Sequence, residues 1–231
     1  MSTTHYDLLS RLVAYPGPEL RAEVAHAVVA LSESYPRAAQ KLEHFLQLLP
    51  ADDLLALREL HTRTFDVQPI TSLDIGYTLF GEDYKRGALL ANLSSEHTRV
   101  GNDCGTELAD HLTNVLRLLP KLIDASLREE LVRVLLGPAL EEMIREFDPT
   151  RLAKKEALYK KHHKTLIEAA AGETRVAYRH LLEAIFEVLR QDFSLKTTLP
   201  REQESSFAKA VSTELGIEDC DGCTSAPGGT P

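Results

Sequence analysis

The most restrictive feature of this 231-residue chain is the spacing of its apolar residues, which recur every three or four positions along most of its length. This spacing is typical of amphipathic helices. It is clearest in residues 5–14, 19–34, 36–49, 54–65 and 173–191. The alternation of apolar and polar residues that is typical of half-buried strands is weak throughout. We therefore predict an all-α, single-domain bundle of about nine or ten helices over residues 1–194.

The same spacing predicts helices at 83–97, 107–119 and 126–136, with Thr106 as the N-cap of the second. Gly137-Pro138 indicates a break in the chain, because proline has no N–H to donate within a helix. From Leu195 the apolar spacing fades, and the last residues are rich in Gly, Ser, Thr and Pro. We expect residues 195–231 to form a largely disordered tail.

The excess of acidic residues limits the kinds of partner that this chain can bind. A formal net charge of −9 argues against a nucleic-acid binder, which needs clustered Lys and Arg to neutralise phosphates. It favours a basic peptide or a basic protein surface. The N-terminus shows no secretory signal, and no apolar run reaches the ~20 residues of a membrane span. We expect a cytoplasmic protein without stable membrane insertion. Cys220 and Cys223 form a lone C-x-x-C pair, which is half of a zinc or redox motif.

Residues 72–87 are unusual within this helical pattern, because they combine three glycines, several large apolar side chains and a charged run. They are not a phosphate-binding loop, since Gly81 is followed by Glu82 and Asp83 rather than by Lys and then Ser or Thr. Gly87 falls inside a predicted helix, where glycine costs about 1 kcal/mol relative to alanine. This cost suggests that a backbone or a ligand approaches closely there. A plain helix–helix linker is the alternative.

Glu107, Asp110 and His111 form a second polar group. On the predicted helix, Glu107 and His111 are four residues apart and would share a face. Two carboxylates beside an imidazole are suited to acid–base chemistry or to metal binding. A metal-dependent enzyme that uses these three residues, with His61 or His97, is therefore one alternative. The others are a solvated helix face and a purely structural interaction module.

Three blocks of the sequence carry a family resemblance: residues 9–16 (LSRLVAYP), 80–87 (FGEDYKRG) and 107–112 (ELADHL). In order and spacing they resemble the nitrate reductase molybdenum cofactor assembly chaperones, within the redox-enzyme maturation chaperones. The family's central block usually has His-Gly-Glu-Ser before Arg-Asp-Arg-Gly. Here it is Phe-Gly-Glu-Asp before Tyr-Lys-Arg-Gly. The departure suggests a client other than the usual respiratory nitrate reductase, such as a related member of the DMSO reductase superfamily.

The resemblance implies an all-helical cytoplasmic chaperone that is not an enzyme. Such a chaperone binds the apo catalytic subunit of a molybdoenzyme through its N-terminal region, and holds it until the molybdenum cofactor has been inserted. It has no permanently bound cofactor, because the molybdenum cofactor is handled on the client. The client's N-terminal peptide is typically a twin-arginine leader or its remnant, which is basic and apolar by turns.

By this resemblance, the family's Gly-Glu pair maps onto Gly81-Glu82 and its Asp-His pair onto Asp110-His111. Arginine side chains of a client would prefer carboxylates, because their planar geometries match. We expect the two blocks to be neighbours in space and to form the two walls of one site. The predicted client-binding residues are Phe80, Gly81, Glu82, Tyr84, Arg86, Glu107, Asp110 and His111.

Overall fold

The computed structural model describes residues 4–51, 53–163 and 172–195, and this part of the chain is all-α, as the sequence predicts. Its eleven α-helices are α1 (Thr4–Val13), α2 (Leu20–Leu31), α3 (Pro36–Leu48), α4 (Leu54–Phe65), α5 (Ile75–Phe80), α6 (Tyr84–Arg99), α7 (Leu112–Leu118), α8 (Ala125–Glu130), α9 (Gly137–Arg145), α10 (Pro149–His163) and α11 (Ala177–Phe193). Short 3₁₀ segments at Leu119–Lys121 and Gly172–Val176 complete it, with a π-helical segment at Leu131–Leu136.

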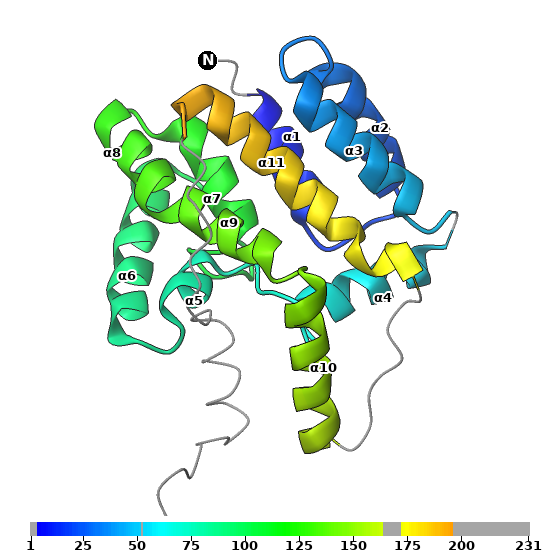
Figure 1. The fold of residues 1–231 in the computed structure, drawn as a ribbon. Coiled ribbons are helices and arrows are strands. Elements are labelled where there is room, and N and C mark those ends of the chain that lie inside the picture. The colour runs from blue at the N-terminus through cyan, green and yellow to red at the C-terminus, as the bar shows by residue number, and fades with distance from the viewer. Residues whose placement is uncertain (1–3, 52, 164–171, 196–231) are drawn as a thin grey trace, which may run out of the picture.

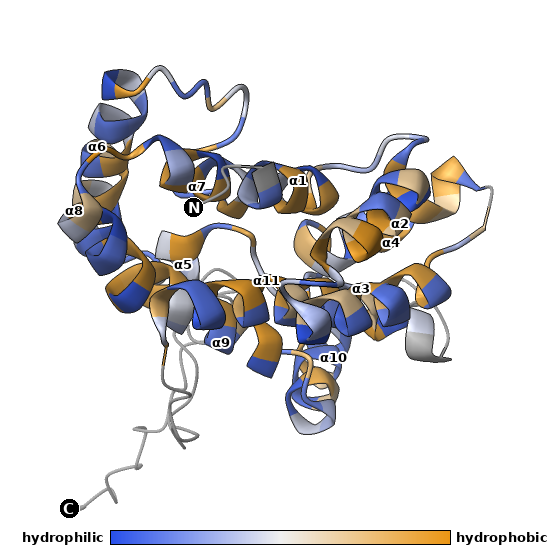
Figure 2. Ribbon diagram, turned by 90° about the horizontal axis from the view of Figure 1, so that it is seen from above, coloured by the Kyte–Doolittle hydropathy of each residue, from blue (hydrophilic) through white to orange (hydrophobic). Residues whose placement is uncertain are grey.

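The last helix organises the bundle. α11 runs across the middle of the molecule and packs against α3 on one side and α9 on the other (Figure 1). Its buried face includes Tyr178, Leu182, Ile185 and Leu189, at the spacing that the sequence predicted. Hydrophobic and hydrophilic residues occur together on single helices such as α3 and α9 (Figure 2). The apolar faces meet in one hydrophobic core that extends from Tyr6 to Phe193.

The first four helices begin and end within a few residues of their predicted bounds. At α4 a side chain also caps the helix, because Asp53 accepts a hydrogen bond from the backbone N–H of Ala56 at 3.0 Å. A side chain at this position satisfies one of the amides that the first turn leaves unpaired. Local spacing and capping are therefore sufficient to place this part of the fold.

The predicted helix at 107–119 is wrong in its first half, because α7 begins only at Leu112. Residues before it form turns, in which Gly101 and Gly105 both have φ near +62°. The side-chain amide of Asn114 donates to the carbonyls of Cys104 (3.2 Å) and Leu108 (2.8 Å), which holds these turns against the helix. The N-cap is His111, not Thr106.

The predicted break at Gly137-Pro138 is also wrong. Helical structure continues from Ala125 to Arg145, and the six residues before Gly137 are π-helical. A π turn contains one more residue than an α turn. The chain therefore accommodates Pro138, which has no N–H for the regular hydrogen bond to the carbonyl of residue i−4. The wider turn lets α8 and α9 form one continuous helical run.

The predicted tail at 195–231, including Cys220 and Cys223, lies outside the described residues except for Leu195. In the part of the chain that the structure describes, no helix combines the length and the apolar character needed to cross a membrane.

Candidate functional site

A short antiparallel contact joins the two blocks that the sequence singled out. The backbone N–H of Ile75 donates to the carbonyl of Asp110 (3.0 Å), and the N–H of Leu112 donates to the carbonyl of Leu73 (2.8 Å). Asp74 and His111 face each other as an isolated β-bridge. The prediction that the central stretch and the later block are neighbours in space is thus confirmed.

This extended pairing sends neighbouring side chains to opposite sides, as in any strand. His111 and Asp74 line a cleft, whereas Asp110 points into the protein and is 0% exposed. The predicted helix is wrong at residues 107–111, which form turns, and Asp110 points away from Glu107 and His111. Within the described residues, no three His, Cys, Asp or Glu side chains come together in a way that could hold a metal ion.

Asp110 belongs to a buried ionic network behind the cleft. Its Oδ2 accepts a hydrogen bond from the backbone N–H of Gly76 (3.0 Å) and lies 3.7 Å from Nε of Arg86. The same guanidinium donates to Asp74 Oδ2 at 2.9 Å and stacks over the ring of Tyr77. Burial raises the pKa of Asp110 above its usual value, the nearby carboxylate of Asp74 raises it further, and Arg86 opposes both. The network ties the start of α5 to α6 and to the chain before α7.

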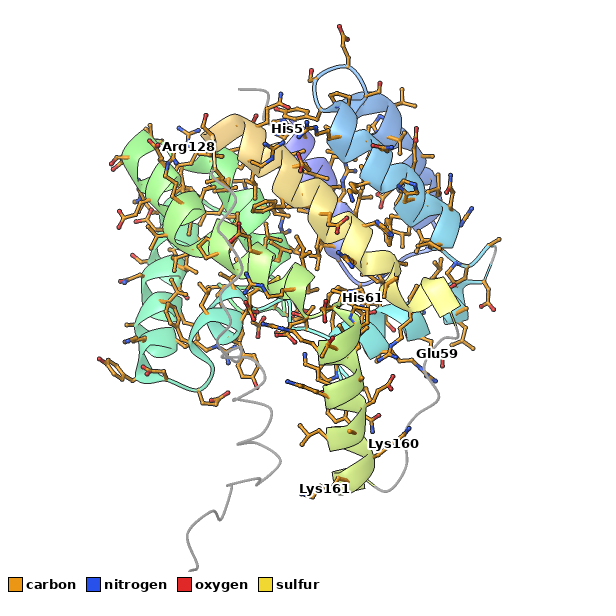
Figure 3. The ribbon with its side chains drawn as sticks, in the orientation of Figure 1. His5, Glu59, His61, Arg128, Lys160 and Lys161 are labelled. Carbon is orange, nitrogen blue, oxygen red and sulfur yellow. The ribbon has the colours of Figure 1, made fainter. Side chains whose placement is uncertain are left out.

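The cleft itself has a volume of about 490 Å³, within the ~300–1,000 Å³ of typical ligand sites. Its walls come from the C-terminal ends of α1 and α4, from residues 72–74, and from the chain between Glu107 and the first turns of α7. Figure 3 shows His61, which lines the cleft, at the inner side of α4. Four separate parts of the chain therefore build one site.

The charge of the cleft is mainly negative. Asp66, Asp74 and Glu107 line it, against the single guanidinium of Arg117. The pKa of Asp66 is raised, first by partial removal from water and then by the charge of Glu107. Burial likewise raises the pKa of Asp74, with Arg86 opposing it. A cation placed among these carboxylates would relieve their mutual repulsion.

Two histidines in the cleft are held in the neutral form. His61 is 5% exposed, and its Nε2–H donates to the carbonyl of Val13 at 3.2 Å. Burial lowers the pKa of His61 to about 4. Nδ1 of His111 accepts a bond from the N–H of Thr113 (3.3 Å), which requires an unprotonated nitrogen. Burial also lowers the pKa of His111, although Glu107, whose Oε2 lies 4.0 Å from its Nε2, acts in the opposite sense.

Exposed apolar side chains accompany the carboxylates. Tyr15, which lines the cleft, is 58% exposed, and Val67 (43%) and Leu108 (47%) directly follow the lining residues Asp66 and Glu107. The guanidinium of Arg58 lies 5.5 Å from the centroid of the Tyr15 ring and helps to fix it. The site therefore offers negative charge together with the exposed ring of Tyr15.

Among the predicted site residues, only Glu107 and His111 line this cleft. Phe80, Gly81, Glu82 and Tyr84 lie at the turn between α5 and α6, where Glu82 and Tyr84 are exposed. Arg86 and Asp110 lie behind the cleft, in the ionic network.

Four residues that the cleft brings together are not among the predicted site residues: Tyr15, Asp66, Asp74 and Arg117. Tyr15 falls within the first resemblance block, and Asp74 falls within the central stretch. Their place in these two stretches is the sequence signal that could have selected Tyr15 and Asp74 as site residues. Asp66 and Arg117 are single charged residues at the end of one helix and inside another, and no local pattern marks them.

Comparison of the sequence with protein-family models finds no match, and comparison with curated proteins finds none either.

Proposed function

We propose that this chain is a cytoplasmic chaperone that binds the apo catalytic subunit of a molybdoenzyme, of the nitrate reductase kind or a related member of the DMSO reductase superfamily. It would hold the subunit through its N-terminal region while the molybdenum cofactor is inserted. It would perform no chemistry and keep no cofactor of its own. The observation that carries the proposal is the cleft, which combines three carboxylates with the exposed ring of Tyr15.

The chemistry of the cleft suits a peptide that is basic and apolar by turns. An arginine side chain can bind a carboxylate through two parallel charge-assisted hydrogen bonds, and Asp66, Asp74 and Glu107 supply the acceptors. Neighbouring leucine-like side chains of such a peptide would meet the exposed ring of Tyr15. The net charge of −9 adds a longer-range attraction that acts over roughly 8 Å at physiological salt.

The resemblance of residues 9–16, 80–87 and 107–112 to the chaperone family supports the same function. Two of these blocks contribute to the cleft, through Tyr15 and through Glu107 and His111. The third supplies Arg86, which holds Asp74 from behind. The alternative of a metal-dependent enzyme gains no support from the geometry, because Asp110 faces away from Glu107 and His111.

We expect the double substitution Asp66→Gln and Glu107→Gln to weaken binding of the client's N-terminal region at least tenfold. Hydrogen bonds to charged groups are each worth about 1.5–3 kcal/mol, and tenfold in affinity is about 1.4 kcal/mol. Calorimetric titration with the N-terminal peptide of an apo molybdoenzyme catalytic subunit measures this.

The matched control for this double variant is Glu33→Gln with Glu43→Gln, which removes the same charge from exposed positions outside the cleft. An equal loss in both double variants would show that binding follows net charge alone, as in a structural interaction module. Absence of binding to any such subunit by the unaltered protein would contradict the proposed function.

A further inference from the structure

The segment between α4 and α5 forms one wall of the cleft and is held from outside by α10. Asp66, Ser72 and Leu73 of this segment line the cleft. On its outer side, the carbonyls of Pro69 and Ile70 accept hydrogen bonds from two side chains of α10. We infer that these two side chains, Lys155 and Tyr159, are positioning residues of the cleft, which hold the wall segment in the geometry that binds a cationic peptide. This inference rests on the proposed function.

The contacts of Lys155 are short and removed from water. Its Nζ donates to the carbonyl of Ile70 and lies 2.7 Å from Glu146 Oε2 at the end of α9. The hydroxyl of Tyr159, one turn further along α10, donates to the carbonyl of Pro69 at 3.1 Å. Lys155, Glu146 and Tyr159 are all buried. Both carbonyls are thus tied to the same face of the same helix.

The network behind Lys155 fixes α10 to the body of the protein. Arg151, one turn before Lys155, donates to Glu142 Oε1 (2.6 Å) and to Glu146 Oε1 (2.7 Å), both on the α9 side. Beyond these contacts α10 projects from the bundle, with Lys160 and Lys161 near its far end (Figure 3). The buried part of α10 therefore connects α9 to the wall of the cleft.

The wall segment is also held by backbone hydrogen bonds to α4. The N–H groups of Ile70 and Thr71 both donate to the carbonyl of Thr64 at the end of α4 (2.9 and 3.2 Å). These bonds fix the inner end of the segment, and Gln68 at φ +49° makes the turn between. The contacts with α10 hold the carbonyls at 69 and 70 as well, between the lining residues Asp66 and Ser72.

A buried ammonium is an expensive way to fill space, because an apolar side chain would pack there without losing hydration. The positioning role explains the lysine, because its ammonium donates to the carbonyl of Ile70 and pairs with Glu146 at the same time. Burial lowers the pKa of Lys155 to about 8. The carboxylates of Glu146 and Glu142 act to raise it, and Arg151 acts to lower it.

The test uses the full chain and a labelled synthetic peptide that contains two adjacent arginines followed by leucines. We expect Lys155→Met to weaken binding of this peptide about tenfold and Tyr159→Phe about threefold, by fluorescence anisotropy. Lys154→Met is the matched control, because Lys154 is exposed on the same helix and its substitution removes the same charge. Its affinity should equal that of the unaltered protein.

A pH profile separates positioning from a merely structural role. The peptide is N-acetylated, because a free α-amino group would titrate near pH 8 and arginine does not, so a change in affinity that Lys155→Met abolishes reports on Lys155. As pH rises through about 8, Lys155 loses its proton and its pairing with Glu146. The affinity of the unaltered protein should fall several-fold between pH 7.5 and 9.5, whereas that of Lys155→Met should stay level.

The outcomes distinguish the two proposals. Equal affinity and equal pH profiles in the unaltered protein and in Lys155→Met would overturn the positioning role and leave the chaperone function standing. No peptide binding by the unaltered protein would overturn both. If Lys155→Met does not fold, Tyr159→Phe decides, because it removes a single hydroxyl: a threefold loss supports the inference and an unchanged affinity overturns it.

Discussion

Acidification from pH 6.5 to pH 4 is expected to lower the free energy of unfolding by about 3 kcal/mol through His61 alone. Burial lowers the folded-state pKa of this histidine to about 4, against an ordinary value of 6.5. Each pKa unit of difference between the folded and unfolded states corresponds to about 1.4 kcal/mol. Between these two pH values the imidazole of His61 is protonated in the unfolded chain and neutral in the folded chain. Stability is therefore complete above pH 6.5 and is lost as pH falls towards 4.

The surroundings of His61 explain why its imidazole stays neutral. Its ring packs edge-on against Phe65 and Tyr178, with centroid distances of 4.9 and 5.5 Å, and against Tyr15 at 5.4 Å. Nε2–H is already committed to the carbonyl of Val13. A second proton would place a charge among three aromatic rings, and the loss of hydration there outweighs the carbonyl of Val13 and the more distant Glu107, which both favour it.

Urea denaturation at a series of pH values measures this effect, and His61→Gln isolates it. Glutamine can keep a donor for the carbonyl of Val13 but does not titrate, so the variant should lose about 3 kcal/mol less than the unaltered protein between pH 6.5 and 4. The exposed His26, substituted in the same way, should leave the profile unchanged. Parallel profiles for His61→Gln and the unaltered protein would show that His61 is not held neutral.

The helices of this fold could be predicted wherever a local signal determines them. The apolar spacing and the Asp53 cap place α4 because both lie within a few residues of the helix they define. The spacing of Leu108 and Leu112 misled the prediction at 107–119, since Leu108 is exposed and only Leu112 is buried. There, pairing with residues 73–75, far away in sequence, overrides the local helical pattern.

The candidate site was predictable only in part, for a related reason. Glu107 and His111 could be selected because they lie in one short block, and the central stretch could be recognised as their neighbour. Tyr15 and Asp66 reach the same cleft from the ends of α1 and α4. Their approach depends on how the helices pack, which a reading of local patterns does not contain.

Gly76 and Gly87 also show that the packing around a residue cannot be predicted from the local sequence. The cost of Gly87 within a helix predicts a close approach there, yet apart from its chain neighbours and its own helix backbone no heavy atom of the described residues lies within 4 Å of a Cβ built there. The close approach is at Gly76, where a Cβ would lie 2.7 Å from Oδ2 of Asp110. Both residues are helical, and only the packing around them differs.

Gly76→Ala is accordingly expected to lower the free energy of unfolding by about 2 kcal/mol, although alanine is the better helix former. Asp110 Oδ2 cannot move aside freely, because it accepts the N–H of Gly76 and lies against Nε of Arg86. Gly87→Ala is the matched control. It meets no neighbour, so it should raise stability by up to about 1 kcal/mol.

A double-mutant cycle identifies the cause. Asp110→Ala alone should cost about 3 kcal/mol, because it leaves a buried N–H without its acceptor and Arg86 with less compensating charge. In that background Gly76→Ala should cost less than about 0.5 kcal/mol, since the obstructing atom is gone and the nearby side-chain atoms of Leu89 and Arg86 can shift. An equal cost in both backgrounds would contradict the proposed clash.

The same variants test what Asp110 contributes to the proposed binding of a client. Asp110 is fully buried behind the cleft, so Asp110→Ala should reduce client binding only as far as it disturbs Asp74 and the network around Arg86. Asp110→Asn keeps an oxygen that can accept the N–H of Gly76, and it should restore most of both the stability and the binding. If instead both variants fold normally and both lose binding, the client contacts Asp110 directly, and the cleft must open further than this structure shows.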